Sequence, residues 1–198
     1  MDQAQRAANW KIRAVFLAAC GGALVVFSLF IFGFYPVAIV DGSVITARKF
    51  RAASHSVLFY YENTGGISDQ EENNMDSARR LELESQVLND LVEEELIAKK
   101  LARDFGSELP YLIAEELDGV KNSPDLKQAA TMLYGMKWEN FEKEILVSEA
   151  KKSILANQLF LKNEKIEDWI HRARESANVT VFSLKFKWDD SKVIVKNQ

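Results

Sequence analysis

The sequence contains one cysteine, Cys20, and only three prolines and two histidines among 198 residues. No thiol follows position 20, which excludes disulfides, zinc–cysteine sites and cysteine nucleophiles from the remainder of the chain. His55 and His171 show no metal-ligand spacing, and phosphate-binding and nucleophile-elbow motifs are absent. Acidic runs such as Glu93-Glu94-Glu95 are typical of solvated helix faces. We therefore expect no metal, no cofactor and no catalytic residue.

Charge is unevenly distributed along the chain. Between Ala14 and Val40 there is no charged residue, and 22 of these 27 residues are apolar. The residues before this run carry a net charge of +2, and those from Asp41 onward carry −6. An acidic domain argues against a nucleic-acid partner, because binding to phosphates requires positive charge.

The apolar run predicts a transmembrane helix over residues 14–35. Its 22 residues would span about 33 Å, enough for the hydrocarbon core of a bilayer. Trp10 and Tyr35 stand at its two ends, where aromatic rings prefer the membrane interface. A cleaved signal peptide would have a shorter apolar core. A second alternative is a lipoprotein, since Leu17 to Cys20 resembles a lipobox whose cysteine is lipidated.

Basic residues next to the run favour a cytoplasmic N-terminus. The predicted organisation is a cytoplasmic tail (1–13), the helix (14–35) and an extracytoplasmic domain (36–198), anchored as a single-pass protein in the cytoplasmic (inner) membrane. Small residues four apart favour a homodimer through this helix, although such residues are also common in membrane helices generally. The residues of this stripe are Ala14, Ala18 and Gly22.

Local patterns predict a mainly helical domain after residue 36. Asp41-Gly42 lies between two short β-favouring runs and predicts a hairpin, after which Thr46 is placed to cap a helix reaching about Glu62. Apolar residues at helical spacing predict five further helices. Their expected ranges are residues 75–105, 110–119, 123–135, 138–161 and 166–177.

The pattern changes at the C-terminal end of the chain. Apolar residues alternate strictly from Val181 to Trp188, which predicts one strand with a buried face, and a turn at 189–191 leads to a second strand over 192–196. Isolated hairpins are marginal in water, so we expect the N- and C-terminal strands to share a sheet. The predicted fold class is mainly α (α+β): an N-terminal transmembrane helix, then a helical domain closed by one small antiparallel sheet.

Three segments resemble, in order, the SurA N-terminal-like chaperone domain of the SurA, PpiD and PrsA foldase family. Residues 40–46 (VDGSVIT) resemble its opening hairpin, residues 87–97 (VLNDLVEEELI) its leucine-rich helix, and residues 133–141 (LYGMKWENF) the joint before its next long helix. The resemblance covers most of residues 37–188. It implies a fold of helices closed by a small sheet.

The resemblance also implies a function. Isomerases of this family insert a parvulin domain between the helix that here ends near Leu161 and the helix that begins near Lys165. Only residues 162–164 occupy that join, so the resemblance implies a chaperone that binds unfolded or nascent extracytoplasmic polypeptides and is not an enzyme. The alternatives are an adaptor subunit that binds one folded partner, and a peptidylprolyl isomerase with an unrecognised site.

A chaperone surface is expected to be apolar and adaptable, because unfolded clients expose apolar side chains. Aromatic and methionine residues near the ends of the predicted helices are the candidates for client binding, and burial in the core is the alternative for each. They are Phe59, Tyr60, Tyr61, Met132, Tyr134, Met136, Trp138 and Phe160.

Overall fold

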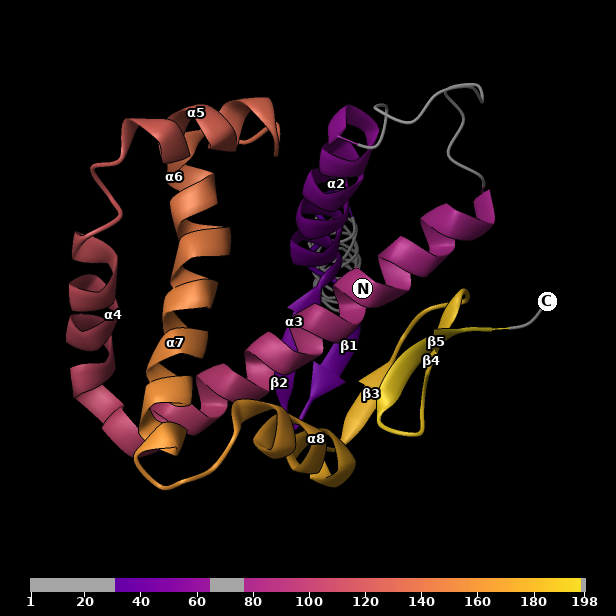
Figure 1. Ribbon diagram of the computed structural model, residues 1–198. Helices are drawn as coiled ribbons and strands as arrows, with labels where there is room; N and C mark the ends of the chain where they lie inside the picture. The colour runs from indigo at the N-terminus through magenta and orange to yellow at the C-terminus, as the bar shows by residue number, and fades with distance from the viewer. Residues whose placement is uncertain (1–30, 65–76, 197–198) are drawn as a thin grey trace, which may run out of the picture.

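The computed structural model describes residues 31–64 and 77–196. Helix α3 (Ser77–Phe105) crosses the molecule, and α2 (Ala47–Thr64), α7 (Val147–Phe160) and α8 (Ile166–Ser176) all pack against it (Figure 1). The shorter helical segments are η2 (Gly106–Glu108), α4 (Leu109–Asp118), α5 (Pro124–Met132), α6 (Trp138–Phe141) and the π-helical η3 (Glu142–Leu146). The strands are β1 (Pro36–Val40), β2 (Ser43–Thr46), β3 (Val179–Val181), β4 (Phe186–Asp189) and β5 (Lys192–Val195).

Local signals produce the N-terminal hairpin and the start of α2. β1 pairs antiparallel with β2, and the turn residues Asp41 and Gly42 have φ angles of 49° and 91°. Positive φ at both positions is typical of the two-residue turns that match the twist of paired strands. Thr46 Oγ1 accepts a hydrogen bond of 3.2 Å from the Lys49 amide, as expected of a helix N-cap. The predicted hairpin and cap are therefore confirmed.

The predicted single sheet is wrong, because the structure has two. β3 pairs with β1, so strands from the two ends of the domain do meet, but β4 pairs with β5 in a separate sheet. The break lies at Ser183, whose Oγ accepts hydrogen bonds from the amides of Lys185 and Phe186. Such a side-chain turn competes with strand pairing and interrupts the alternating segment.

The break also changes which side chains are buried. The strand prediction placed Phe182, Leu184 and Phe186 on one buried face. Phe186 is buried, but Phe182 is 53% and Leu184 is 95% exposed. Alternation alone did not reveal that the chain turns between them.

Apolar residues form three cores. The first lies between the sheets, α2 and the N-terminal part of α3, and its buried residues are Val37, Ala38, Val40, Ile45, Ala47, Val87, Leu88, Leu91, Val92, Leu96, Phe186 and Val193. The second lies between α3 and α7, and its buried residues are Ile97, Leu101, Ile154, Leu155 and Leu159. The third lies around the α5–α6 joint and consists of Ala130, Met136 and Phe141. Trp169 on α8 packs against both the first and the second.

The membrane prediction also needs correction. No helix within residues 31–64 and 77–196 is both long and apolar enough to cross a membrane. The predicted transmembrane helix and single-pass localisation are therefore wrong for this part of the chain. Residues 14–30 of the predicted span lie outside the described residues, and Tyr35 is half-buried against the first core. Ala14, Ala18, Cys20 and Gly22 are among residues 14–30, and Trp10 also lies outside the described ranges.

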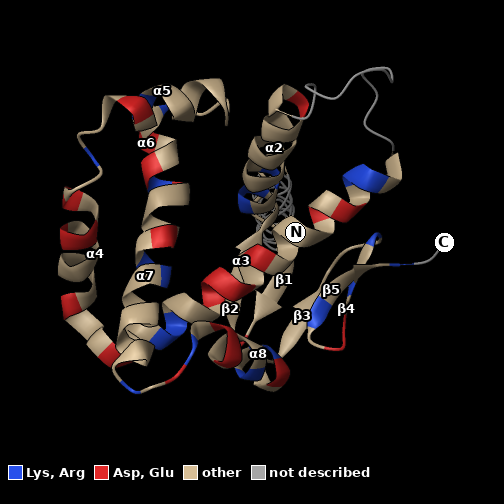
Figure 2. Ribbon diagram, viewed as in Figure 1, with Lys and Arg blue, Asp and Glu red and all other residues tan. Residues whose placement is uncertain are grey.

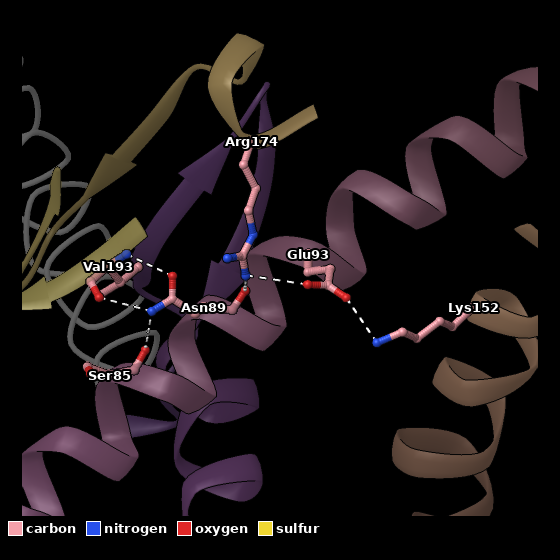
Figure 3. A network of polar contacts seen from close by, with 6 residues as sticks. All are labelled: Ser85, Asn89, Glu93, Lys152, Arg174 and Val193. Atoms are coloured by element: carbon pink, nitrogen blue, oxygen red, sulfur yellow. Dashed lines mark hydrogen bonds and ion pairs between the residues drawn. The ribbon is translucent and has the colours of Figure 1, made fainter. Parts of the chain in front are cut away.

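A single asparagine joins the β4–β5 sheet to α3 (Figure 3). Asn89 Nδ2 donates to the carbonyl oxygens of Val193 (2.9 Å) and Ser85 (3.0 Å). Its Oδ1 accepts from the Val193 amide at 2.8 Å. The side chain therefore pairs with both main-chain groups of Val193, as a neighbouring strand would, and fixes β5 on the helix.

We expect Asn89→Ala to lower the free energy of unfolding by about 1 to 3 kcal/mol, because the main-chain groups of the buried residue Val193 lose their side-chain partners. Urea denaturation monitored by circular dichroism measures this change. Asn157→Ala is the matched control, since Asn157 is an exposed residue in the last turn of α7. An Asn89→Ala effect no larger than that of the control would contradict the role of Asn89.

Candidate functional site

A groove of about 320 Å³ lies between α2, α3 and the η3–α7 segment. Figure 1 shows α2 and the α6–α7 column as two arms that both meet α3. We call this feature the central groove. Its lining residues are Ala53, Ser56, Val57, Val87, Asp90, Leu91, Glu93, Glu94, Ile97, Tyr134, Glu144, Ile145, Ser148, Glu149 and Lys152.

Each helix contributes a stripe of residues at helical spacing. Residues 53, 56 and 57 lie on one face of α2, and residues 90, 93, 94 and 97 on one face of α3. Residues 145, 148, 149 and 152 form the third stripe, on the opposite arm. Val87, Leu91 and Ile97 are buried and form an apolar base. Beside them on α3, Glu93 and Glu94 are half-buried and Asp90 is more exposed.

The charged residues of the central groove are mostly acidic. Five carboxylates and a single lysine line it. Glu93 at its base contacts Lys152 on α7 (3.1 Å) and Arg174 on α8 (3.5 Å), so that one carboxylate links three helices (Figure 3). Burial acts to lower the pKa of Lys152, but its hydrogen bond to the Glu93 carboxylate and the neighbouring carboxylates outweigh burial and raise the pKa above its ordinary value.

Asp90 lies in a less favourable environment than Glu93. Burial of its carboxyl group and repulsion from Glu93 and Glu149 raise its pKa, and attraction from Arg174 and Lys152 only partly offsets this. The described residues offer it neither a hydrogen-bond donor nor an ion-pair partner within bonding distance. The ionised form of Asp90 therefore destabilises the fold.

Aromatic residues close one end of the central groove. The rings of Tyr60 on α2 and Tyr134 beside α6 are stacked with centroids 5.5 Å apart. Gly135 has a φ of 62°, and a Cβ atom there would lie 3.1 Å from the Phe59 ring. We call Phe59, Tyr60, Tyr134 and Gly135 the aromatic clasp. It joins the C-terminal end of α2 to the α5–α6 joint across the groove.

No protein-family model, curated protein or solved structure matches this chain. Within the described ranges, no three His, Cys, Asp or Glu side chains are arranged to hold a metal ion. His55 stacks on Phe59 with ring centroids 6.3 Å apart, and His171 lies 3.4 Å from Glu175 on α8.

The structure brings together some of the predicted client-binding residues. Phe59, Tyr60 and Tyr134 meet in the aromatic clasp, and Tyr61 packs edge-on against Tyr60. Tyr134 is the one predicted residue that lines the central groove.

The other four predicted residues lie elsewhere. Met136 is buried in the third core, and Trp138 packs against Phe141 of that core. Met132 is exposed on α5. Phe160 is exposed at the end of α7, where the chain turns toward α8.

Sequence reasoning missed the acidic and aliphatic residues of the groove. Asp90, Glu93 and Glu94 have the i, i+3, i+4 spacing of one helix face, which the sequence analysis interpreted as a solvated surface. Ile97 lies on the same helix face as these carboxylates. A helix face that carries both acidic and aliphatic residues is suited to a groove wall, and this pattern could have identified the groove from the sequence. Which stripes face one another depends on the packing of α2 and α7 on α3.

We expect Gly135→Ala to destabilise the protein by about 2 kcal/mol, since it combines left-handed backbone strain with a close approach to the Phe59 ring. Gly106→Ala is the control, because Gly106 also has positive φ (51°) but a Cβ atom there would have no neighbour within 4 Å. Its expected cost is about 1 kcal/mol. Equal effects in urea denaturation would show that the clasp contact contributes nothing.

We expect Asp90→Asn to raise the Tm at pH 7 by about 1 to 2 °C, because it removes a charge that the fold disfavours and that solvent partly screens. The pKa of Asp90 is higher in the folded state than its ordinary value of 3.8. The difference in Tm between variant and wild type should therefore shrink as pH falls through the raised pKa, and vanish below 3.8.

Asp104 provides a comparison, because its pKa is shifted in the opposite direction to that of Asp90. Hydrogen bonds from Lys100 and Gln158 lower the pKa of Asp104, so its ionised form stabilises the fold. Asp104→Asn should therefore lower the Tm at pH 7. Thermal denaturation from pH 3 to pH 7 measures the change in Tm for each variant. A lower Tm for Asp90→Asn than for wild type at neutral pH would contradict the prediction for Asp90.

Proposed function

We propose that this protein is a non-catalytic, chaperone-like protein that binds apolar segments of unfolded polypeptides in the central groove. The observation that supports this most directly is the groove itself, which combines a buried aliphatic base with accessible walls. Apolar side chains gain about 25 cal/mol for each Å² removed from water, without any need for a particular sequence. Such binding requires neither a cofactor nor covalent chemistry.

Two features favour an adaptable groove. The π-helical segment η3 contributes Glu144 and Ile145 to the lining, and π-helical turns are frequent at functional sites. The aromatic clasp rests on rings that are not fully buried, since Tyr60 is 36% exposed. Separating two stacked rings costs about 0.5 to 1.5 kcal/mol beyond the area exposed, which is small enough for a client to displace them.

A second candidate function is docking to one folded partner. Phe160 and Leu161 form an exposed apolar pair at the end of α7, with exposed fractions of 79% and 84%. Adjacent exposed apolar side chains are typical of protein contact sites. This candidate predicts one specific partner and no general binding of unstructured peptides.

The test combines peptide binding with suppression of aggregation by the full-length chain. We expect unstructured, fluorescently labelled peptides rich in aliphatic and aromatic residues to bind with a Kd on the order of micromolar, measured by fluorescence anisotropy. The same protein should suppress aggregation of an unrelated unfolding protein at near-stoichiometric amounts. Ser148→Trp should weaken peptide binding about tenfold or more, because the indole would occupy the groove beside α3.

Ser107→Trp is the matched control, since Ser107 is exposed on η2 and lies outside the groove lining. Circular dichroism establishes that both variants are folded. Equal peptide affinity of the two variants would exclude the central groove as the binding site. No peptide binding and no suppression by the folded wild-type chain would refute the chaperone function and favour the Phe160–Leu161 docking candidate.

A further inference from the structure

The central groove concentrates negative charge. Its lining has five carboxylates and one lysine, which gives a net charge equal to the −4 of the entire 198-residue chain. Figure 2 shows acidic segments on α3 and on the α6–α7 column, the two elements that contribute these carboxylates. Charge of one sign in a recess with apolar walls produces a stronger local potential than the same charge on an open surface.

Internal ion pairs neutralise only part of this charge. Glu93 pairs with Lys152 and Arg174, and Glu94 lies 3.2 Å from Lys49. The other three carboxylates are Asp90, Glu144 and Glu149, and none of them has an ion pair within the described part of the chain. Partial burial of the Asp90 carboxyl group, followed by repulsion from Glu93, raises its pKa.

We infer that the central groove selects cationic apolar segments, in which lysine or arginine alternates with aliphatic or aromatic residues. This inference rests on the proposed function. Apolar client side chains pack on the half-buried residues Ala53, Val57 and Ile145. The client's ammonium or guanidinium groups approach Asp90, Glu144 and Glu149. Charge complementarity of this kind determines which clients bind and how fast, because it steers association and disfavours anionic segments.

The test uses three labelled unstructured peptides with the same apolar residues and with lysine, glutamine or glutamate at the intervening positions. We expect the lysine peptide to bind the full-length protein about tenfold more tightly than the glutamine peptide, and the glutamate peptide to bind most weakly. The difference should shrink as salt rises from about 0.05 M to 0.5 M, because ions screen exposed charges. Fluorescence anisotropy measures each Kd.

Two triple variants locate the source of the preference. Asp90→Asn, Glu144→Gln and Glu149→Gln together should reduce the preference for lysine over glutamine to less than about threefold, with little change in binding of the glutamine peptide. The control combines Glu108→Gln, Asp118→Asn and Glu139→Gln, which removes the same charge from exposed positions outside the groove. The control should keep the wild-type preference.

The outcomes separate this inference from the proposed function. Binding of all three peptides with equal affinity would overturn the charge preference and leave the chaperone function standing. If the control variant loses the preference for the lysine peptide, or the groove variant keeps it, the preference comes from the overall charge of the protein. Either outcome would also overturn the inference. Binding of none of the peptides would refute the proposed function, and the charge preference with it.

Discussion

The structure depends on the packing of its other elements along one long helix. The 29 residues of α3 extend about 43 Å, which is longer than a single core of this size can cover. Leu88 and Val92 therefore belong to the first core, and Leu101 belongs to the second. The central groove lies where α2 and α7 diverge from this shared helix. The groove exists because two separate cores form on the same helix, α3.

Polar contacts hold the two halves in register along α3. Asn89 replaces a missing strand neighbour for Val193, and Glu93 one turn later contacts both Lys152 and Arg174 (Figure 3). The position and orientation of the groove walls depend on these contacts. Asp90, between Asn89 and Glu93, instead retains a charge that the fold disfavours.

Much of the local structure could be predicted because its causes are local. Asp41-Gly42 adopts the turn that its backbone preferences favour, Thr46 caps α2, and α3 ends at Phe105 as Gly106 predicts. The continuous C-terminal strand was predicted wrongly, because the hydroxyl of Ser183 turns the chain and sends β3 and β4 into different sheets. The membrane helix was inferred from the length and hydropathy of residues 14–35 and from the aromatic residues at the two ends of this segment, but no helix in the described ranges is long and apolar enough to span a membrane.

The sequence by itself determined which segments are helical or extended and where most of them begin and end, because capping, turn preference and periodicity act over a few residues. It also predicted client-binding residues around Tyr134, whose ring stacks on that of Tyr60 in the structure. Only the tertiary structure decided that Met136 is buried, that Phe160 lies apart, and that separate acidic stripes line one groove. The reason is physical. The sequence of a helix face is the same whether that face is exposed to water or packs on another helix, and contacts between residues far apart in the chain decide between the two.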